Sequence, residues 1–154
     1  MTATTYDDVR ESLVTAIDQA GTHVDAMELT VAQLKAQMPD YSWVGIYLLD
    51  GDELVLGPFL GKPSPHTRIP LNQGICGAAA SQRETIIVDD VDADPRYLAC
   101  SLETRSEIVV PILRGTEVLG EIDIDSDKKA VFGAADRVLL EAVAARLARK
   151  FPPR

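Results

Sequence analysis

The sequence predicts an α+β fold in which a central antiparallel sheet has helices packed on it. Helical spacing of apolar residues occurs at both ends of the chain, whereas two hairpin-like pairs of strand segments occupy the middle. The regular strand–helix alternation of a doubly wound parallel sheet is missing, so helices segregated to one face fit the order best. The chain has 154 residues, and since one domain usually has roughly 100–200 residues, we expect a single domain over residues 1–154.

The N-terminal helices are expected within residues 1–39. Thr5 and Asp8 have the spacing of a capping box, which opens the first helix. Residues 21–23 interrupt the helical pattern, and a second helix follows. It should end before Pro39, because the residue that precedes a proline disfavours the helical conformation.

The sheet and its loops are expected within residues 41–132. Residues 43–49 are rich in β-forming residues and apolar on both faces, as in a central strand covered on each side. A tight turn follows, and residues 53–59 are expected to pair with this strand as a hairpin. A second hairpin joins residues 107–113 to residues 117–125.

Shorter elements fill the rest of the chain. Residues 68–71 and 85–88 indicate short strands, and residues 75–82, rich in small side chains, indicate a short, closely packed helix. Residues 89–105 form a long acidic loop, of a length at which loops are usually functional or disordered. A helix over residues 133–150 closes the chain.

The composition excludes several classes of partner. Fifteen Lys and Arg against 24 Asp and Glu give a net charge of −9, which repels nucleic-acid backbones and anionic membrane surfaces. The chain has neither a basic start followed by an apolar run nor a stretch long enough to cross a bilayer, so we expect a cytoplasmic protein without a signal peptide. Two Cys and two His without ligand spacing argue against a structural zinc site.

The two cysteines are candidates for redox chemistry. Cys76 opens the short predicted helix, where the helix dipole would lower the pKa of its thiol, although a free cysteine is more often a small buried hydrophobe. Cys100 falls in the long loop, where a thiol is more accessible and hence more reactive. A reversible disulfide between them needs their Cα atoms to approach within about 4.4–6.8 Å, which the residues by themselves leave open.

Acidic residues alternate along one predicted strand. Glu121, Asp123 and Asp125 share a face, with successive carboxylates about 7 Å apart along the strand. The commoner explanation is a solvated outer face. Glu107 starts the neighbouring strand, so a further carboxylate lies within the same hairpin. If these residues cluster in a cleft, repulsion raises one pKa and leaves a protonated carboxylic acid at neutral pH.

Two aromatic residues and a loop histidine complete the candidates. Trp43 and Tyr47 lie four residues apart on one strand and share a face, where core packing is the default and a pocket wall is the alternative. Ser64 and His66 fall in a proline-rich loop. A lone loop histidine is usually a surface residue, and we expect the same of His66.

Several motifs together resemble the GAF-domain free methionine-(R)-sulfoxide reductases. The resemblance runs from about Tyr41 to Asp136, and the spacings from Cys76 to Cys100 and from Cys100 to Glu107 are the family's own. The set is more specific than any single motif. It consists of Trp43-Val44-Gly45-Ile46-Tyr47-Leu48-Leu49, Leu56-Gly57-Pro58-Phe59, Gly61-Lys62-Pro63, Gly74-Ile75-Cys76-Gly77, Ala99-Cys100, Ser106-Glu107-Ile108-Val109-Val110-Pro111 and Asp123-Ile124-Asp125-Ser126.

The resemblance implies a GAF-like antiparallel sheet and a thiol-dependent oxidoreductase. Cys100 would attack the sulfoxide sulfur of free methionine-(R)-sulfoxide and become a sulfenic acid as methionine leaves. Cys76 would condense with it to a disulfide that thioredoxin reduces, with no bound cofactor and no metal. Trp43 and Tyr47 would wall the pocket around the substrate methyl group. The carboxylates that would bind the substrate's ammonium and sulfoxide groups are Glu107, Asp123 and Asp125.

The chain departs from the resembled family in one respect. Many members carry a third cysteine, often the main resolving thiol, ten residues before the position of Cys76, and His66 stands there in this chain. Resolution would then fall to Cys76 alone. The alternative to an enzyme is a GAF module that binds a small molecule or senses redox state. Because the chain ends soon after Lys150, we expect no output domain, which favours the enzyme and leaves an adaptor protein as the other alternative. A homodimer is left open.

Overall fold

The computed structural model describes residues 5–98 and 103–153, and within them it has the predicted α+β fold. The strands form one sheet in the order β3-β2-β1-β6-β5-β4, in which every neighbouring pair is antiparallel. The elements in chain order are α1 (Tyr6–Gln19), α2 (His23–Gln37), β1 (Trp43–Asp50), β2 (Glu53–Leu60), β3 (Arg68–Pro70), α3 (Gly74–Gln82), β4 (Ile86–Val88), η1 (Val91–Ala93), β5 (Ser106–Arg114), β6 (Glu117–Ser126) and α4 (Ala134–Lys150).

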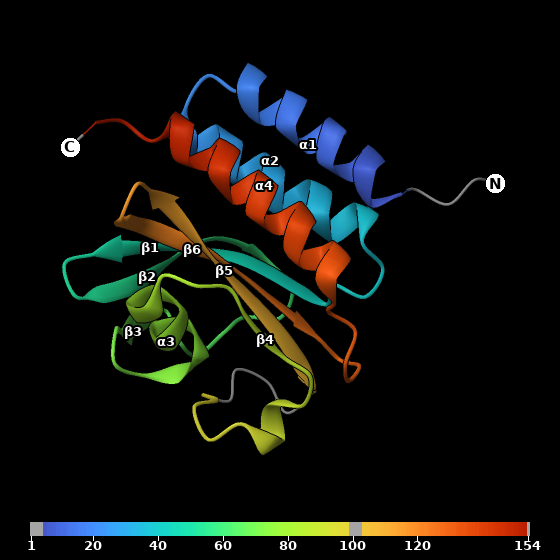
Figure 1. The fold of residues 1–154 in the computed structure, drawn as a ribbon, viewed down its shortest axis with the longest axis vertical. Coiled ribbons are helices and arrows are strands. Elements are labelled where there is room, and N and C mark those ends of the chain that lie inside the picture. The colour runs from blue at the N-terminus through green and yellow to red at the C-terminus, as the bar shows by residue number, and fades with distance from the viewer. Residues whose placement is uncertain (1–4, 99–102, 154) are drawn as a thin grey trace.

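Helices cover both faces of the sheet. The long helices α1, α2 and α4 lie together on one face, and the short helix α3 lies on the other (Figure 1). Buried side chains divide accordingly into a larger core under the long helices and a smaller one under α3. The expectation that helices gather on one face holds for the long helices. Helix α3 departs from it because its Gly- and Ala-rich surface packs against β3, β5 and β6 from the opposite side.

Capping residues set the starts of the first two helices. Thr5 Oγ1 accepts a hydrogen bond from the amide of Asp8 at 3.1 Å, and Asp8 Oδ2 accepts one from the amide of Thr5 at 3.4 Å, so the predicted capping box is present. Thr22 caps α2 through the amide of Asp25 at 3.0 Å. Helix α2 ends before Pro39, as predicted from the restriction that a proline places on its predecessor.

Both predicted hairpins are present, and one contains a bulge. Strand β1 pairs with β2 on one side and with β6 on the other, so it is central, as predicted. A register shift between Ile112 and Leu113 of β5 leaves Leu119 of β6 without an opposite residue. Strict alternation would place Val118 on the same side as Ile122. The bulge reverses this, so that Val118 joins the core under α3 while Ile122 joins the core under the long helices.

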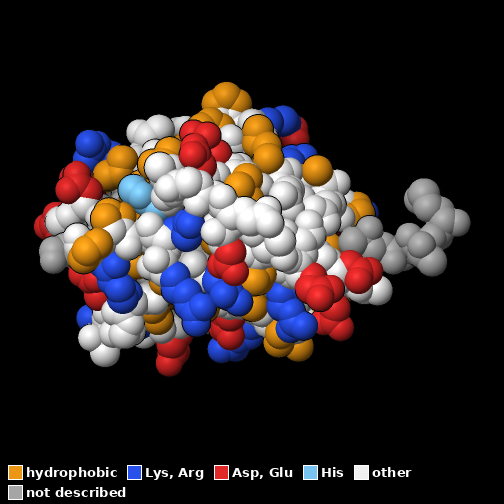
Figure 2. All heavy atoms as spheres, turned by 90° about the horizontal axis from the view of Figure 1, so that it is seen from above, with side chains coloured by type: hydrophobic (Ala, Val, Ile, Leu, Met, Phe, Trp, Pro, Cys, Tyr) orange, Lys and Arg blue, Asp and Glu red, His pale blue; other side chains and the backbone are white. Residues whose placement is uncertain are grey.

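The surface over the long helices mixes charges of both signs. Figure 2, which looks onto this end of the molecule, shows Lys and Arg side chains beside those of Asp and Glu. Ion pairs there join Arg10 to Asp7 and Arg146 to Asp18. This face is therefore not a basic surface of the kind that binds nucleic-acid backbones. Over the described part of the chain, no helix combines the length and the apolar character needed to cross a membrane.

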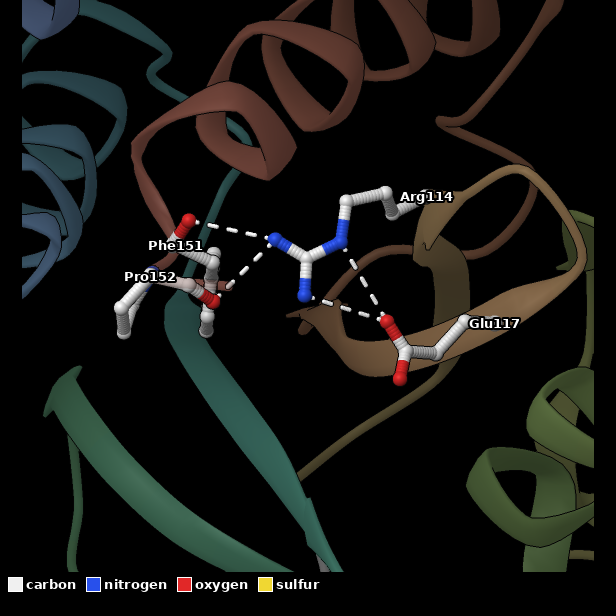
Figure 3. Close-up of polar contacts among 4 residues, drawn as sticks. All are labelled: Arg114, Glu117, Phe151 and Pro152. Carbon is white, nitrogen blue, oxygen red and sulfur yellow. Dashed lines mark hydrogen bonds and ion pairs between the residues drawn. The ribbon is translucent and has the colours of Figure 1, made fainter. Parts of the chain in front are cut away.

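Arg114, the last residue of β5, ties the second hairpin to the end of α4 (Figure 3). One Nη atom donates to the carbonyl oxygens of Phe151 and Pro152, both at 3.2 Å. The other side of the guanidinium donates to Glu117 Oε1 at 3.3 and 3.1 Å. The planar guanidinium group thus binds carbonyl groups that follow the last turn of α4, where a positive charge also interacts favourably with the helix dipole.

Replacing Arg114 should loosen this junction. In Arg114→Lys the compact ammonium cannot reach both sets of partners, so we expect a loss of about 0.5–1.5 kcal/mol in the free energy of unfolding, the usual range for a hydrogen bond. The measurement is the urea unfolding midpoint. Arg149→Lys, at an exposed position near the end of the same helix, is the matched control and should change little. Equal midpoints for wild type and Arg114→Lys would contradict the role given to the guanidinium group.

Candidate active site

Four carboxyl groups lie on the face of the sheet that α3 covers. The register pairs three positions of β1 with three of β6, namely Trp43 with Asp125, Gly45 with Asp123, and Tyr47 with Glu121. On its other side β6 pairs with β5, where Glu107 lies opposite Asp125. All four carboxyl side chains belong to residues that are 3% exposed or less. The solvated outer face, the commoner explanation of the alternating acids, is therefore wrong, because loops and α3 cover this face.

Two glycines make room for the indole of Trp43. A Cβ atom at Gly45 would lie 2.3 Å from the indole ring, and one at Gly61 would lie 2.6 Å from it. Gly61 also has φ 131°, a backbone conformation that side chains other than hydrogen rarely allow. The indole therefore lies across β1 at Gly45, whose partner in β6 is Asp123.

Hydrogen bonds fasten the loop over residues 61–67 to the two aromatic side chains. Trp43 Nε1 donates to the carbonyl oxygen of Lys62 at 2.9 Å, and the hydroxyl of Tyr47 donates to the carbonyl oxygen of His66 at 2.8 Å. The two ring centroids are 6.5 Å apart, so the rings form one continuous wall. The same rings also pack in the core under α3. Core packing and a pocket wall, the two alternatives for these residues, are therefore both present. His66, expected at the surface, is half-buried.

Helix α3 brings Cys76 to the carboxylates. The helix lies close to the preceding chain because Gly77 has no side chain, and a Cβ there would lie 2.8 Å from the carbonyl oxygen of Leu71. Cys76 is 5% exposed. Its thiol contacts the carboxyl groups of Glu121 and Asp123.

The surroundings of Cys76 raise the pKa of its thiol well above the ordinary value. Burial is the largest cause, and the negative charges of Asp123, Glu121 and Glu107 add to it. The expectation that the helix dipole lowers this pKa is therefore wrong. Helix α3 has only 9 residues, and its dipole is outweighed by the loss of water and by the neighbouring carboxylates. Cys76 is a thiol, not a thiolate, at neutral pH.

The carboxyl groups share protons among themselves. The side chain of Glu107 is hydrogen-bonded to both Asp123 and Asp125. Burial raises the pKa of all three groups, and the charge of Asp123 raises those of Glu107 and Asp125 further. Carboxyl groups within hydrogen-bond distance of one another cannot all ionise, so the cluster keeps a protonated carboxylic acid at neutral pH.

Several of the carboxylate oxygens meet no N–H or O–H donor among residues 5–98 and 103–153. They are both oxygens of Glu121, Oδ1 of Asp123 and Oδ1 of Asp125. A buried polar atom left without a partner costs about 1–3 kcal/mol. A ligand that carries N–H or O–H groups, or a positive charge, would offset this cost.

A cavity of about 80 Å³ opens beside the carboxyl cluster. Trp43 and Asp125 both line it, so the aromatic wall and the acidic face meet there. Lys62 and Glu103, which form an ion pair with each other, line it as well. The full lining consists of Ser42, Trp43, Lys62, Glu103, Thr104, Asp125 and Asp127.

The structure brings most of the predicted site residues together. Those found on the α3 side of the sheet are Cys76, Trp43, Tyr47, Glu107, Asp123 and Asp125. Cys100 lies outside the described residues. Glu121 was not among the predicted binding residues, although its alternation with Asp123 placed it on their face. Gly45 was also missed, and its only signal is its position between the two aromatic residues of the strand.

Comparison with known proteins first defines the class. The family model described as the GAF domain matches residues 24–151. The free methionine-R-sulfoxide reductase of Escherichia coli (strain K12) is 37% identical over 118 residues, which are 77% of this chain and 71% of that protein. The free methionine-R-sulfoxide reductase of Saccharomyces cerevisiae is 43% identical over 114 residues, which are 71% of this chain and 63% of that protein.

A solved structure agrees with these relatives. The X-ray structure of free methionine-R-sulfoxide reductase from Neisseria meningitidis, in complex with its substrate, superposes with a TM-score of 0.90 and 38% identity, covering 95% of this chain and 87% of that chain. The chain is thus a GAF domain. It belongs to the GAF-domain free methionine-R-sulfoxide reductase family, which confirms the resemblance drawn from its motifs.

Filling the space at Gly45 should displace the indole of Trp43. In Gly45→Ala the new methyl group meets the ring, so we expect a red shift of its emission and a loss of about 1–3 kcal/mol from overpacking. Trp43 is the only tryptophan, so intrinsic fluorescence reports this residue alone. Gly21→Ala, where a Cβ finds only one atom, at 3.9 Å, is the control and should leave the emission unchanged. An unshifted spectrum in Gly45→Ala would mean that the ring does not depend on this glycine.

The raised pKa of Glu107 should make stability fall as pH rises. Below the ordinary carboxyl value of 4.5, Glu107 is protonated in both folded and unfolded chains. Above it, the unfolded chain releases the proton while the folded chain keeps it, so stability is lost until the pH passes the folded pKa. Glu107→Gln removes this loss. We expect it to be more stable than wild type at pH 8, because it has no proton to release in the unfolded chain.

The measurement is the urea unfolding midpoint of wild type and Glu107→Gln between pH 4 and pH 8. The two curves should lie close together at pH 4 and diverge as the pH increases. Glu84→Gln, at an exposed position, is the control and should follow wild type throughout. Divergence in the opposite direction would mean that Glu107 is ionised and paired in the folded chain.

Proposed function

We propose that this chain reduces free L-methionine-(R)-sulfoxide to L-methionine, with Cys100 as the nucleophile and thioredoxin as the reductant. One observation carries the proposal: a cluster of buried carboxyl groups that meets an aromatic wall at a cavity. The named reductases among the relatives and the solved structures support the same chemistry. Two cysteines and a thioredoxin-dependent cycle suit a reducing cytoplasm, where we place the protein.

The buried acids account for a preference for the free amino acid. The α-ammonium of free methionine sulfoxide carries a positive charge and three N–H donors. Asp123 and Asp125 each have a carboxylate oxygen without a partner among the described residues, and an ammonium group would satisfy both. The neutral nitrogen of a peptide-bound residue would leave the buried carboxylates uncompensated.

The same cluster supplies the proton that the reaction needs. As a thiol attacks the sulfoxide sulfur, the oxygen must take up a proton before it can leave sulfur. Glu107 has the raised pKa of a proton donor and is hydrogen-bonded to both aspartates, which can relay its proton. We assign Glu107 the role of acid. Trp43 and Tyr47 would hold the substrate methyl group against their rings.

Cys76 is the candidate for the resolving step. Sulfoxide reduction consumes two electrons and leaves Cys100 as a sulfenic acid. The Cys76 thiol then attacks this sulfur, forming the disulfide and releasing water, and a thioredoxin dithiol returns both cysteines to thiols. Since the pKa of Cys76 is raised, its proton must leave the sulfur during the attack, and it balances the step by passing to the hydroxyl that leaves as water.

The test is an assay that follows NADPH loss in the presence of thioredoxin and its reductase, with the separate R and S epimers of free methionine sulfoxide. We expect turnover of the R epimer, no activity in Cys100→Ser, and at least about a 100-fold lower kcat/KM for the N-acetylated substrate, since a site built to bind a polar group rejects an analogue without it. Asp125→Asn should lower kcat/KM strongly while changing the free energy of unfolding far less.

A second variant separates the two thiols. Cys76→Ser should reduce one equivalent of substrate and then stop cycling with thioredoxin. Steady-state rates equal to wild type would remove Cys76 from the resolving role. Activity that survives Cys100→Ser would mean that the nucleophile is a different group, and binding of the amino acid without any turnover would favour a GAF sensor module instead.

A further inference from the structure

We propose that Cys76, Glu107 and Asp123 form a binding site for one thiophilic divalent cation of the Zn²⁺ class, and that the bound ion blocks the active site. One ligand atom from each residue, the sulfur and two carboxylate oxygens, lies within 4.8 Å of the other two. The three residues are buried and come from α3, β5 and β6. The blocking part of this inference rests on the proposed function, whereas the binding part does not.

The spacing suits a tetrahedral ion. Zinc binds thiolate sulfur at about 2.3 Å and carboxylate oxygen at about 2.0–2.2 Å, so ligand atoms around it lie about 3.4–3.6 Å apart. Since the three atoms lie within 4.8 Å of one another, side-chain rotations that shorten their separations by at most about 1.4 Å give that geometry. Three protein ligands leave a fourth position for water, which is the open arrangement of zinc sites that are not purely structural.

A second observation points to a ligand at the same place. Oδ1 of Asp123 and Oδ1 of Asp125 are buried without an N–H or O–H donor among the described residues, and so are both oxygens of Glu121. These residues are 3% exposed or less. A cation among them would offset both the missing hydrogen bonds and the mutual repulsion of the carboxylates.

The donor set selects the kind of cation. Mg²⁺ and Ca²⁺ prefer six or more oxygen ligands and do not favour sulfur. A thiolate with two carboxylates suits the borderline ions at the upper end of the Irving–Williams order, of which Zn²⁺ has no redox chemistry of its own. Binding replaces the thiol proton of Cys76 and the carboxyl proton of Glu107 with the metal, so a proton is released from each as the metal–ligand bonds form.

The consequence is competition with the substrate. The ion would occupy Asp123, proposed to bind the substrate ammonium, and Glu107, the proposed acid. It would also hold Cys76 as a metal-bound thiolate, unable to resolve a sulfenic acid. Zn²⁺ should therefore inhibit turnover, and a chelator should restore it. The inhibition should weaken as the substrate concentration rises, because both ligands need Asp123.

The test uses Co²⁺ as a spectroscopic probe of the metal-free, reduced full chain under anaerobic conditions. We expect one equivalent to give a thiolate-to-cobalt charge-transfer band, which Zn²⁺ then removes by displacing the cobalt. Cys76→Ser should lose the band. Glu107→Gln should bind Co²⁺ at least about tenfold more weakly, since even outer partners of a metal site contribute about 10–100-fold.

Two matched controls locate the site. Cys100→Ser should keep the band, and Asp127→Asn, an exposed carboxylate beside the cavity, should keep the affinity of wild type. The site would be overturned by a band that depends on Cys100 and not on Cys76, by the absence of any band, or by an unchanged affinity in Glu107→Gln. Circular dichroism of each variant confirms folding, and the reductase assay without metal tests the proposed function separately.

Discussion

Burial of four carboxyl groups at the centre of the sheet is the constraint on which the rest of this structure depends. Taking a carboxylate out of water costs several kcal/mol, and neighbouring charges of the same sign add to the cost. The chain limits it by keeping protons on the cluster, through the hydrogen bonds between Glu107 and the aspartates. Each other feature of the site either covers these groups or offers them a partner.

Glycine residues contribute to covering the carboxyl groups as much as large side chains do. Gly45 and Gly61 let the indole of Trp43 lie across β1, and Gly77 lets α3 approach closely enough for Cys76 to contact the acids. Hydrogen bonds from Trp43 and Tyr47 to backbone carbonyls then hold the loop over the site. Apolar side chains therefore cover the carboxyl cluster, and electrostatic interactions within the cluster are stronger than in water.

The opposite face of the sheet supplies the stability that such a site lacks. Helices α1, α2 and α4 pack there on a core made of apolar side chains, with cation-bearing side chains such as Arg114 fastening the end of α4. Because β1, β5 and β6 contribute to both faces, a well-packed helical layer holds rigid the strands that carry the acids. The same strands thus carry a stabilising apolar core on one face and polar atoms without partners on the other.

Local patterns were enough to predict the α+β class, the order of the elements, the capping box at Thr5 and the common face of Asp123 and Asp125, since each depends on residues close together in the chain. Tertiary structure alone decided three other points. It decided that the acidic face is buried and not solvated, that α3 lies on that face, and that the pKa of Cys76 is raised and not lowered. The physical reason is that exposure, desolvation and charge repulsion depend on which distant segments cover a residue, and periodicity within one strand or helix carries no record of them.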